Sequence, residues 1–192
     1  RSPTADPGVL GGGFVELRAT TLGRFPRLTS VHVNSTDEKM LASGYAKSVS
    51  VFDLATGQLA REFPDIHSQH INITRFANTT PFLFATSSFD GSVRMWDLRC
   101  PDLTPLYSCK SRDGLVMLTF SPNDQYLLTS AIDNEVCQYS VADGRRLFEV
   151  DFPHTGRKDN YTRSYYASDG DVIISGSSEE SLLRYACAHT GE

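Results

Sequence analysis

Histidine, cysteine and carboxylate side chains could bind a metal or catalyse a reaction, but their spacing in this sequence favours neither. His67 and His70 are close together, yet no cysteine or carboxylate partner stands at a ligand spacing from them. The four cysteines form no Cys-x-x-Cys pair. The sequence also lacks a Gly-x-Ser-x-Gly elbow, a phosphate-binding loop and a His-Glu-x-x-His pair. We therefore expect a protein that is not an enzyme and needs no metal and no cofactor.

Arg99 is the side chain best suited to bind another protein. It follows Trp96, which we expect to end a strand with its ring buried, so Arg99 lies just past that strand. A guanidinium offers five donors in a planar fork, which suits the carboxylates or carbonyls of a partner. The alternative is a solvated arginine that pairs with Asp97 or Asp102, which stabilises the fold by less than about 1 kcal/mol.

The elements that must position these residues form a repeat. Four aromatic residues end similar segments at gaps of 44, 43 and 46 residues: Phe52, Trp96, Tyr139 and Tyr185. Small residues keep the same register: Ser43, Thr86, Thr129 and Ser175. The segments alternate in polarity and are joined by turns rich in Asp, Asn and Gly, so each is expected to be β rather than helical. A four-stranded unit of this length is typical of a β-propeller blade.

The second repeat resembles the WD40 family. The run from Phe84 to Asp97 is similar to the core of the WD40 signature, and the resemblance implies an all-β WD40 β-propeller. It also implies a hydrogen-bonded structural tetrad made by His67, Thr86, Asp90 and Trp96. The other repeats depart from this pattern. None has a matching histidine, and the Trp is replaced by Phe or Tyr. Their Asp position is occupied by Ala46, Asp133 and Glu179.

The segment from Phe84 to Arg99 resembles a more specific WD40 feature. In that family a sixteen-residue box ending in Trp-Asp-x-Arg marks proteins that dock on damaged-DNA-binding protein 1, the adaptor of cullin-4 RING ubiquitin ligases. Ala85 departs from the box, which usually has a larger aliphatic residue there. The resemblance implies that Asp97 and Arg99 bind the adaptor and that the protein is a receptor for an unknown protein substrate. The alternative is a WD40 scaffold for a multiprotein complex with no ubiquitin-ligase link.

Two further stretches, residues 13–34 and 160–166, resemble a plant WD40 group, the DWD hypersensitive to UV-B group. This resemblance implies the same substrate-receptor role, with light or stress signalling as its setting.

A second binding surface is expected on the opposite face of the propeller. Since successive antiparallel strands reverse direction, the turn at Leu98 to Thr104 lies on the face opposite a second set of turns. That second set carries an acidic and aromatic rim suited to a basic or peptide partner: Tyr45, Phe89, Glu135 and Glu179. The alternative is that these are ordinary solvated turn residues.

The repeats also suggest a domain organisation. We expect residues 1–27 to be a linker or the remainder of a preceding blade, followed by blades at about 28–66, 67–111, 112–155 and 156–192, the last one partial. A closed propeller needs roughly four to eight blades. The sequence therefore predicts an incomplete propeller that is part of a longer chain.

Composition narrows the classes of partner. Of the 192 residues, 40% are hydrophobic and 21% are charged, which favours a packed domain over a disordered chain. The net charge of -5 provides no positive field for a nucleic acid, so no direct nucleic-acid binding is expected. No apolar run is long enough to cross a membrane. Few cysteines favour a reducing compartment, so we expect the nucleus, the cytoplasm or both.

Overall fold

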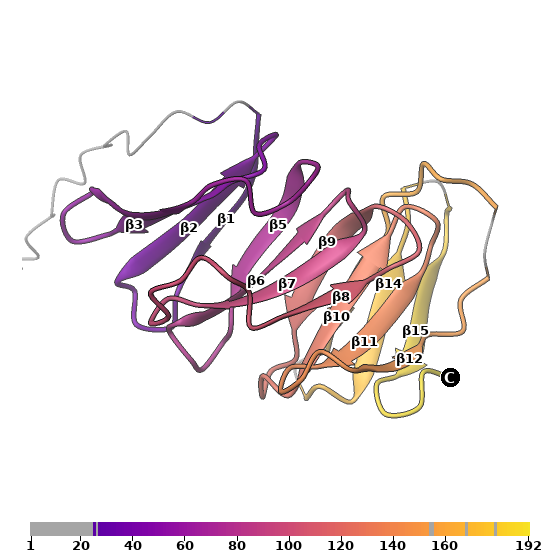
Figure 1. The fold of residues 1–192 in the computed structure, drawn as a ribbon. Helices are drawn as coiled ribbons and strands as arrows, with labels where there is room; N and C mark the ends of the chain where they lie inside the picture. The colour runs from indigo at the N-terminus through magenta and orange to yellow at the C-terminus, as the bar shows by residue number, and fades with distance from the viewer. Residues whose placement is uncertain (1–24, 26, 154–155, 168, 179) are drawn as a thin grey trace, which may run out of the picture.

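The computed structural model consists of antiparallel β-sheets that follow one another in chain order (Figure 1). It describes residues 25, 27–153, 156–167, 169–178 and 180–192. The expectation for residues 1–27 therefore lies almost wholly outside the described residues. Within the described part the structure contains strands and turns and no α-helix, and so no helix long and apolar enough to span a membrane.

Each sheet is an up-and-down meander in which strand order equals chain order. The first sheet contains β1 (Leu28–Val33), β2 (Lys39–Gly44), β3 (Val49–Asp53) and β4 (Leu59–Phe63). The second contains β5 (Ile71–Phe76), β6 (Leu83–Ser88), β7 (Ser92–Asp97) and β8 (Tyr107–Lys110). The third contains β9 (Leu115–Phe120), β10 (Tyr126–Ala131), β11 (Val136–Ser140) and β12 (Arg146–Glu149). The fourth contains β13 (Arg163–Tyr166), β14 (Val172–Gly176) and β15 (Leu183–Cys187).

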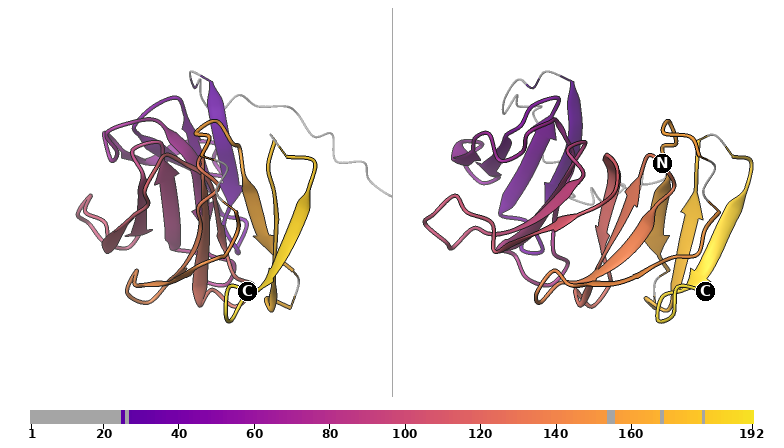
Figure 2. Two further views of the ribbon diagram at one scale, coloured as in Figure 1. Left: turned by 90° about the vertical axis from the view of Figure 1, so that its right-hand side faces the viewer. Right: turned by 45° about the vertical axis from the view of Figure 1, so that its right-hand side comes forward.

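The first strands of the sheets, β1, β5, β9 and β13, lie next to one another along the inner side of the assembly. Figure 2 shows the sheets arranged side by side, each turned relative to the one before it. This is the arrangement of propeller blades, so the expectation of an all-β propeller architecture is confirmed. The turns before and after β7 lie at opposite ends of that strand, as antiparallel pairing requires.

Three hydrophobic clusters fill the spaces between successive blades. Between the first two blades, Phe63 of β4 packs edge-on against Trp96 of β7, with ring centroids 5.5 Å apart, and against Phe84 of β6 at 5.2 Å. Of the four closing aromatics, Phe52, Trp96 and Tyr139 are buried. Tyr185 of β15 is 81% exposed, because its side of the fourth sheet faces solvent in the described part of the chain.

Gly144 in the turn between β11 and β12 offers a test of this packing. Its φ is +73°, and a Cβ built there would clash with Cδ2 of the Tyr107 ring, lie 2.7 Å from Cε2 of that ring and lie 3.0 Å from the Cys109 sulfur. Gly156 has the same backbone conformation, with φ at +72°, and no atom of the described residues lies within 4 Å of such a Cβ. We expect Gly156→Ala to destabilise the fold by about 1–2 kcal/mol through backbone strain alone. Gly144→Ala should cost roughly 1–3 kcal/mol more through overpacking.

The two variants can be compared by the midpoint of urea unfolding. Equal midpoints would contradict the packing of the β11–β12 turn against Tyr107 and Cys109.

Candidate functional site

The structure brings the four expected tetrad residues of the second blade together. Thr86 lies on β6, Trp96 on β7 and Asp90 in the turn between them, while His67 comes from the connection that leads out of β4. The Trp96 indole N–H donates to the Thr86 hydroxyl at 3.1 Å. The Thr86 oxygen lies 2.8 Å from His67 Nε2, and His67 Nδ1 lies 3.0 Å from Asp90 Oδ2.

One assignment of the protons gives these four side chains a consistent series of hydrogen bonds. Thr86 accepts from Trp96 and donates to His67 Nε2, and His67 Nδ1–H donates to Asp90. Burial lowers the pKa of His67 below its usual value, in spite of the nearby Asp90 carboxylate, so the imidazole is neutral at pH 7. Both ring nitrogens are thus engaged, and His67 links β6 and the β6–β7 turn to the connection between the first two blades.

Two serines complete this network, and the sequence analysis did not single them out. Ser92 donates its backbone N–H and its hydroxyl to Asp90 Oδ1, and the Ser68 backbone N–H donates to Asp90 Oδ2 at 2.9 Å. Although burial acts to raise the pKa of Asp90, these hydrogen bonds outweigh it and hold the pKa below its usual value. The signal in the sequence was the Asp-Gly-Ser order, which is typical of an Asp side chain bonded to the backbone two residues later.

The third blade fixes the equivalent connection with a different residue, Glu135. Its carboxylate accepts from the Ser111 hydroxyl and from the Arg112 backbone N–H. The prediction that Glu135 belongs to an exposed partner face is therefore wrong, because this residue is only 1% exposed. The side chain points inward, where Arg112 and Arg146 lie within ion-pair distance of it.

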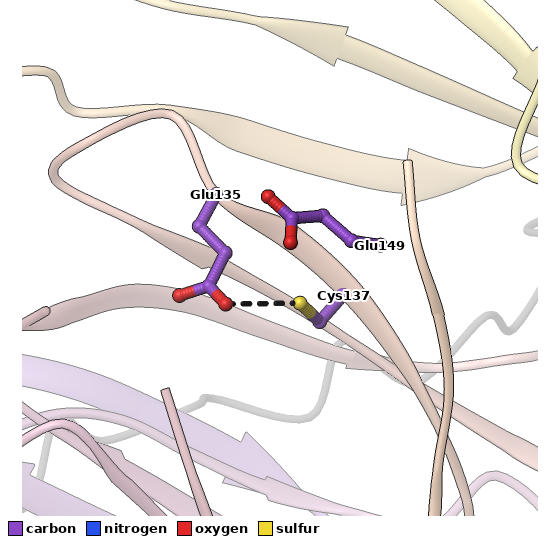
Figure 3. Close-up of side chains that lie close together, drawn as sticks. All are labelled: Glu135, Cys137 and Glu149. Atoms are coloured by element: carbon purple, nitrogen blue, oxygen red, sulfur yellow. Dashed lines mark hydrogen bonds between the residues drawn. The ribbon is translucent and has the colours of Figure 1, made fainter. Parts of the chain in front are cut away.

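Glu135, Cys137 and Glu149 come close enough together to suggest a cation site (Figure 3). The Cys137 thiol donates to Glu135 at 3.3 Å, and burial raises its pKa well above its usual value. Arg112 and Arg146 both pair with Glu149 as well as with Glu135. A protonated thiol and two carboxylates already neutralised by arginines do not suit a cation.

The turn after β7 carries the two expected adaptor-binding residues. Arg99 donates through Nε and Nη2 to both carboxylate oxygens of Asp97, at 2.6 to 3.2 Å. Its guanidinium also lies 5.3 Å from the centre of the Phe82 ring. The Arg99 side chain is nevertheless 62% exposed. Hydrogen bonding from Arg99 keeps the pKa of Asp97 below its usual value, so the pair stays charged at neutral pH.

Arg61 of β4, in the first blade, braces this turn. Its Nη1 donates to the backbone carbonyls of Leu98 and Cys100 at 3.0 and 2.8 Å, and its Nη2 donates to that of Pro101 at 2.9 Å. The guanidinium also covers the Phe63 ring at 4.7 Å. The sequence analysis did not identify Arg61, because its acceptors are backbone carbonyls of a turn far away in the sequence. Such acceptors require no particular residue types near the arginine.

On the opposite face, the expected aromatic residues form a stack. Tyr45, 47% exposed, stacks on His70 at 4.3 Å, and His70 stacks on Phe89 at 4.4 Å. The Arg27 guanidinium covers the other side of Tyr45 at 4.2 Å. The fourth residue expected on this face, Glu179, lies outside the described residues. Tyr45 and Phe89 are thus brought together by His70, which the sequence analysis had considered only as a metal ligand.

Comparisons with known proteins point to one family. The family model "WD domain, G-beta repeat" matches residues 58–97, which run from β4 to the end of β7. The chain is 49% identical over 173 residues to Protein DWD HYPERSENSITIVE TO UV-B 1 of Arabidopsis thaliana, which covers 90% of this chain and 22% of that protein.

More distant relatives also carry WD repeats. The chain is 25% identical over 147 residues to a WD repeat-containing protein 55 homolog of Drosophila yakuba, covering 76% of this chain and 28% of the relative. It is 29% identical over 102 residues to a Ribosome biogenesis protein WDR12 homolog of Nematostella vectensis, covering 52% and 24%. The chain thus spans about a quarter of the length of each relative.

The tetrad predicts a large effect of Thr86→Val. Valine keeps the shape of threonine but leaves the Trp96 indole N–H and His67 Nε2 without their partner, at a cost of roughly 1–3 kcal/mol for each buried group. Thr104→Val, at an exposed position, is the matched control. Equal urea midpoints for the two variants would show that Thr86 does not connect the network.

Arg61→Ala should loosen the turn that carries Arg99 without unfolding the blades. Hydrogen bonds from a charged donor stabilise by about 1.5–3 kcal/mol, so amide exchange across residues 98–104 should accelerate roughly tenfold or more. Arg145→Ala, which removes an exposed arginine from the corresponding turn of the third blade, should leave this exchange unchanged. Hydrogen–deuterium exchange with peptide resolution makes the comparison, and equal rates in both variants would contradict the bracing role.

Proposed function

Because the chain is a WD40 repeat protein, we propose that it acts as a protein-interaction module that performs no catalysis itself. The proposed role is a substrate receptor of a cullin-4 RING ubiquitin ligase that docks on the adaptor, damaged-DNA-binding protein 1, through Asp97 and Arg99. Ubiquitin transfer would occur on other subunits, and the module would contribute proximity. The proposed compartment is the nucleus, the cytoplasm or both.

The observation that carries this proposal is the geometry of Arg99. Asp97 engages Nε and Nη2 of the guanidinium, while Nη1 has no partner among the described residues. The side chain is therefore fixed in direction and still has donors for the carboxylates or carbonyls of a partner. The box from Phe84 to Arg99 supports the same role, as does the DWD label in the name of the Arabidopsis relative.

The substrate would bind on the opposite face. Tyr45, His70 and Phe89 present a partly exposed aromatic surface at the end of the blades remote from Arg99. Aromatic side chains are frequent anchors of protein interfaces. An adaptor and a target on opposite faces could be held at the same time. The target is an unidentified protein.

A second candidate function is a WD40 scaffold with no ubiquitin-ligase link. The ion pair between Arg99 and Asp97, with Phe82 beside it, favours this reading, because a self-contained exposed pair needs no partner to explain it.

Affinity for the purified adaptor separates the two functions. In the full-length protein, Arg99→Ala should weaken adaptor binding at least about 30-fold, the equivalent of a hot-spot residue of about 2 kcal/mol. Arg145→Ala, on the same face of the neighbouring blade, should bind as the wild type does. Calorimetric titration gives the affinities, and circular dichroism checks that each variant is folded. Unchanged binding by Arg99→Ala would refute docking through this residue, and no binding by the wild type would favour the scaffold.

A further inference from the structure

Arg75, on the inner strand β5, is a half-buried cation for which the described part of the chain supplies no counter-ion. Its Nε is shielded from solvent and has no hydrogen-bond partner, and no carboxylate pairs with its guanidinium in the described part of the chain. Burial lowers the pKa of Arg75 below its usual value, although an arginine stays charged. A buried polar atom without a hydrogen-bond partner is costly, so the shielded Nε is expected to have a partner.

The side chain lines a pocket of about 440 Å³ at the end of the inner strands. Strands β5, β9 and β13 and the turns that follow them bound the pocket. Among the described residues no acidic side chain lines it, and the lining consists of Arg75, Asn78, Thr119, Phe120, Pro122, Tyr165, Tyr166 and Ala167. Its donors are the Arg75 guanidinium and the Tyr165 hydroxyl, because the Thr119 hydroxyl donates to the Phe120 carbonyl. Tyr165 is 43% exposed, and its hydroxyl has no partner among the described residues.

Arg75 is the one charged residue in the described lining of this pocket. His32 on β1 lies close enough to Arg75 that burial and the arginine charge together lower its pKa to about 4. Asp124, the acidic residue bound to Asn78 at the pocket rim, already accepts from Asn78 and from the backbone and side chain of Thr79. Asp124 keeps its charge, but it does not line the pocket and forms no ion pair with Arg75. Arg75 can therefore attract an anion.

We propose that this pocket binds an oxyanion, the carboxylate or phosphate group of a small ligand, through the Arg75 fork and the Tyr165 hydroxyl. Both groups offer acceptor oxygens at a spacing that suits bidentate binding by a guanidinium. The site is independent of the docking turn, because neither Asp97 nor Arg99 lines the pocket.

Anion-dependent thermal stability of the full-length protein tests this site. Inorganic phosphate and acetate are titrated separately against chloride at constant ionic strength. A specific site should raise the melting temperature in a saturable way, on the order of 2 °C at an anion concentration of about five times Kd. Saturation with phosphate alone, or with acetate alone, identifies which of the two groups the pocket takes.

Three variants separate the pocket from general salt effects. Arg75→Gln should abolish the saturable rise, while Arg163→Gln, which removes an exposed arginine from the inner strand β13, should keep it. Tyr165→Phe removes only a partly exposed hydroxyl and should raise the apparent Kd several-fold, so it remains informative if Arg75→Gln does not fold. A non-saturable rise, an identical response in all variants, or no rise with either anion would overturn the proposal.

Discussion

The buried indole N–H of Trp96 sets the constraint on which the second blade depends. Between two sheets it has no access to water, so an acceptor must come from the protein. The Thr86 hydroxyl accepts this bond, and because it is buried too, it must donate onward to His67. His67 then needs an acceptor for its second nitrogen, which Asp90 supplies. A ring buried for its apolar area thereby fixes the connection between two blades.

The third blade shows what this constraint leaves free to vary. Tyr139 occupies the position of Trp96, and its hydroxyl reaches the Lys110 carbonyl without any histidine. Glu135 then binds the Arg112 backbone N–H, as Asp90 binds that of Ser68 in the second blade. Both blades thus use a buried carboxylate to hold the incoming connection, although the two carboxylates stand at different positions of the repeat. The shared requirement is a satisfied backbone donor rather than a conserved set of four side chains.

The same comparison explains how far the sequence could predict the structure. The repeat period located the strands and the buried ring of Trp96, because alternation and register are set locally. Glu135 was assigned to the wrong surface because the period gives a position along a turn and not the direction of its side chain. Ser92, its equivalent 43 residues earlier, is buried as well, but this burial is visible only in the structure. Arg61 and Arg75 could not be recognised, since their surroundings come from other blades.

The candidate docking turn is therefore a property of two blades rather than of the box alone. The box supplies Asp97 and Arg99, but Arg61 from the first blade holds three carbonyls of the same turn and itself rests on Phe63. Phe63 packs against Trp96, so the core between the blades and the exposed turn share one set of contacts. A turn held in this way loses little conformational entropy when a partner binds Arg99. A similar box without such an arginine on the preceding outer strand would carry the same residues on a less rigid turn.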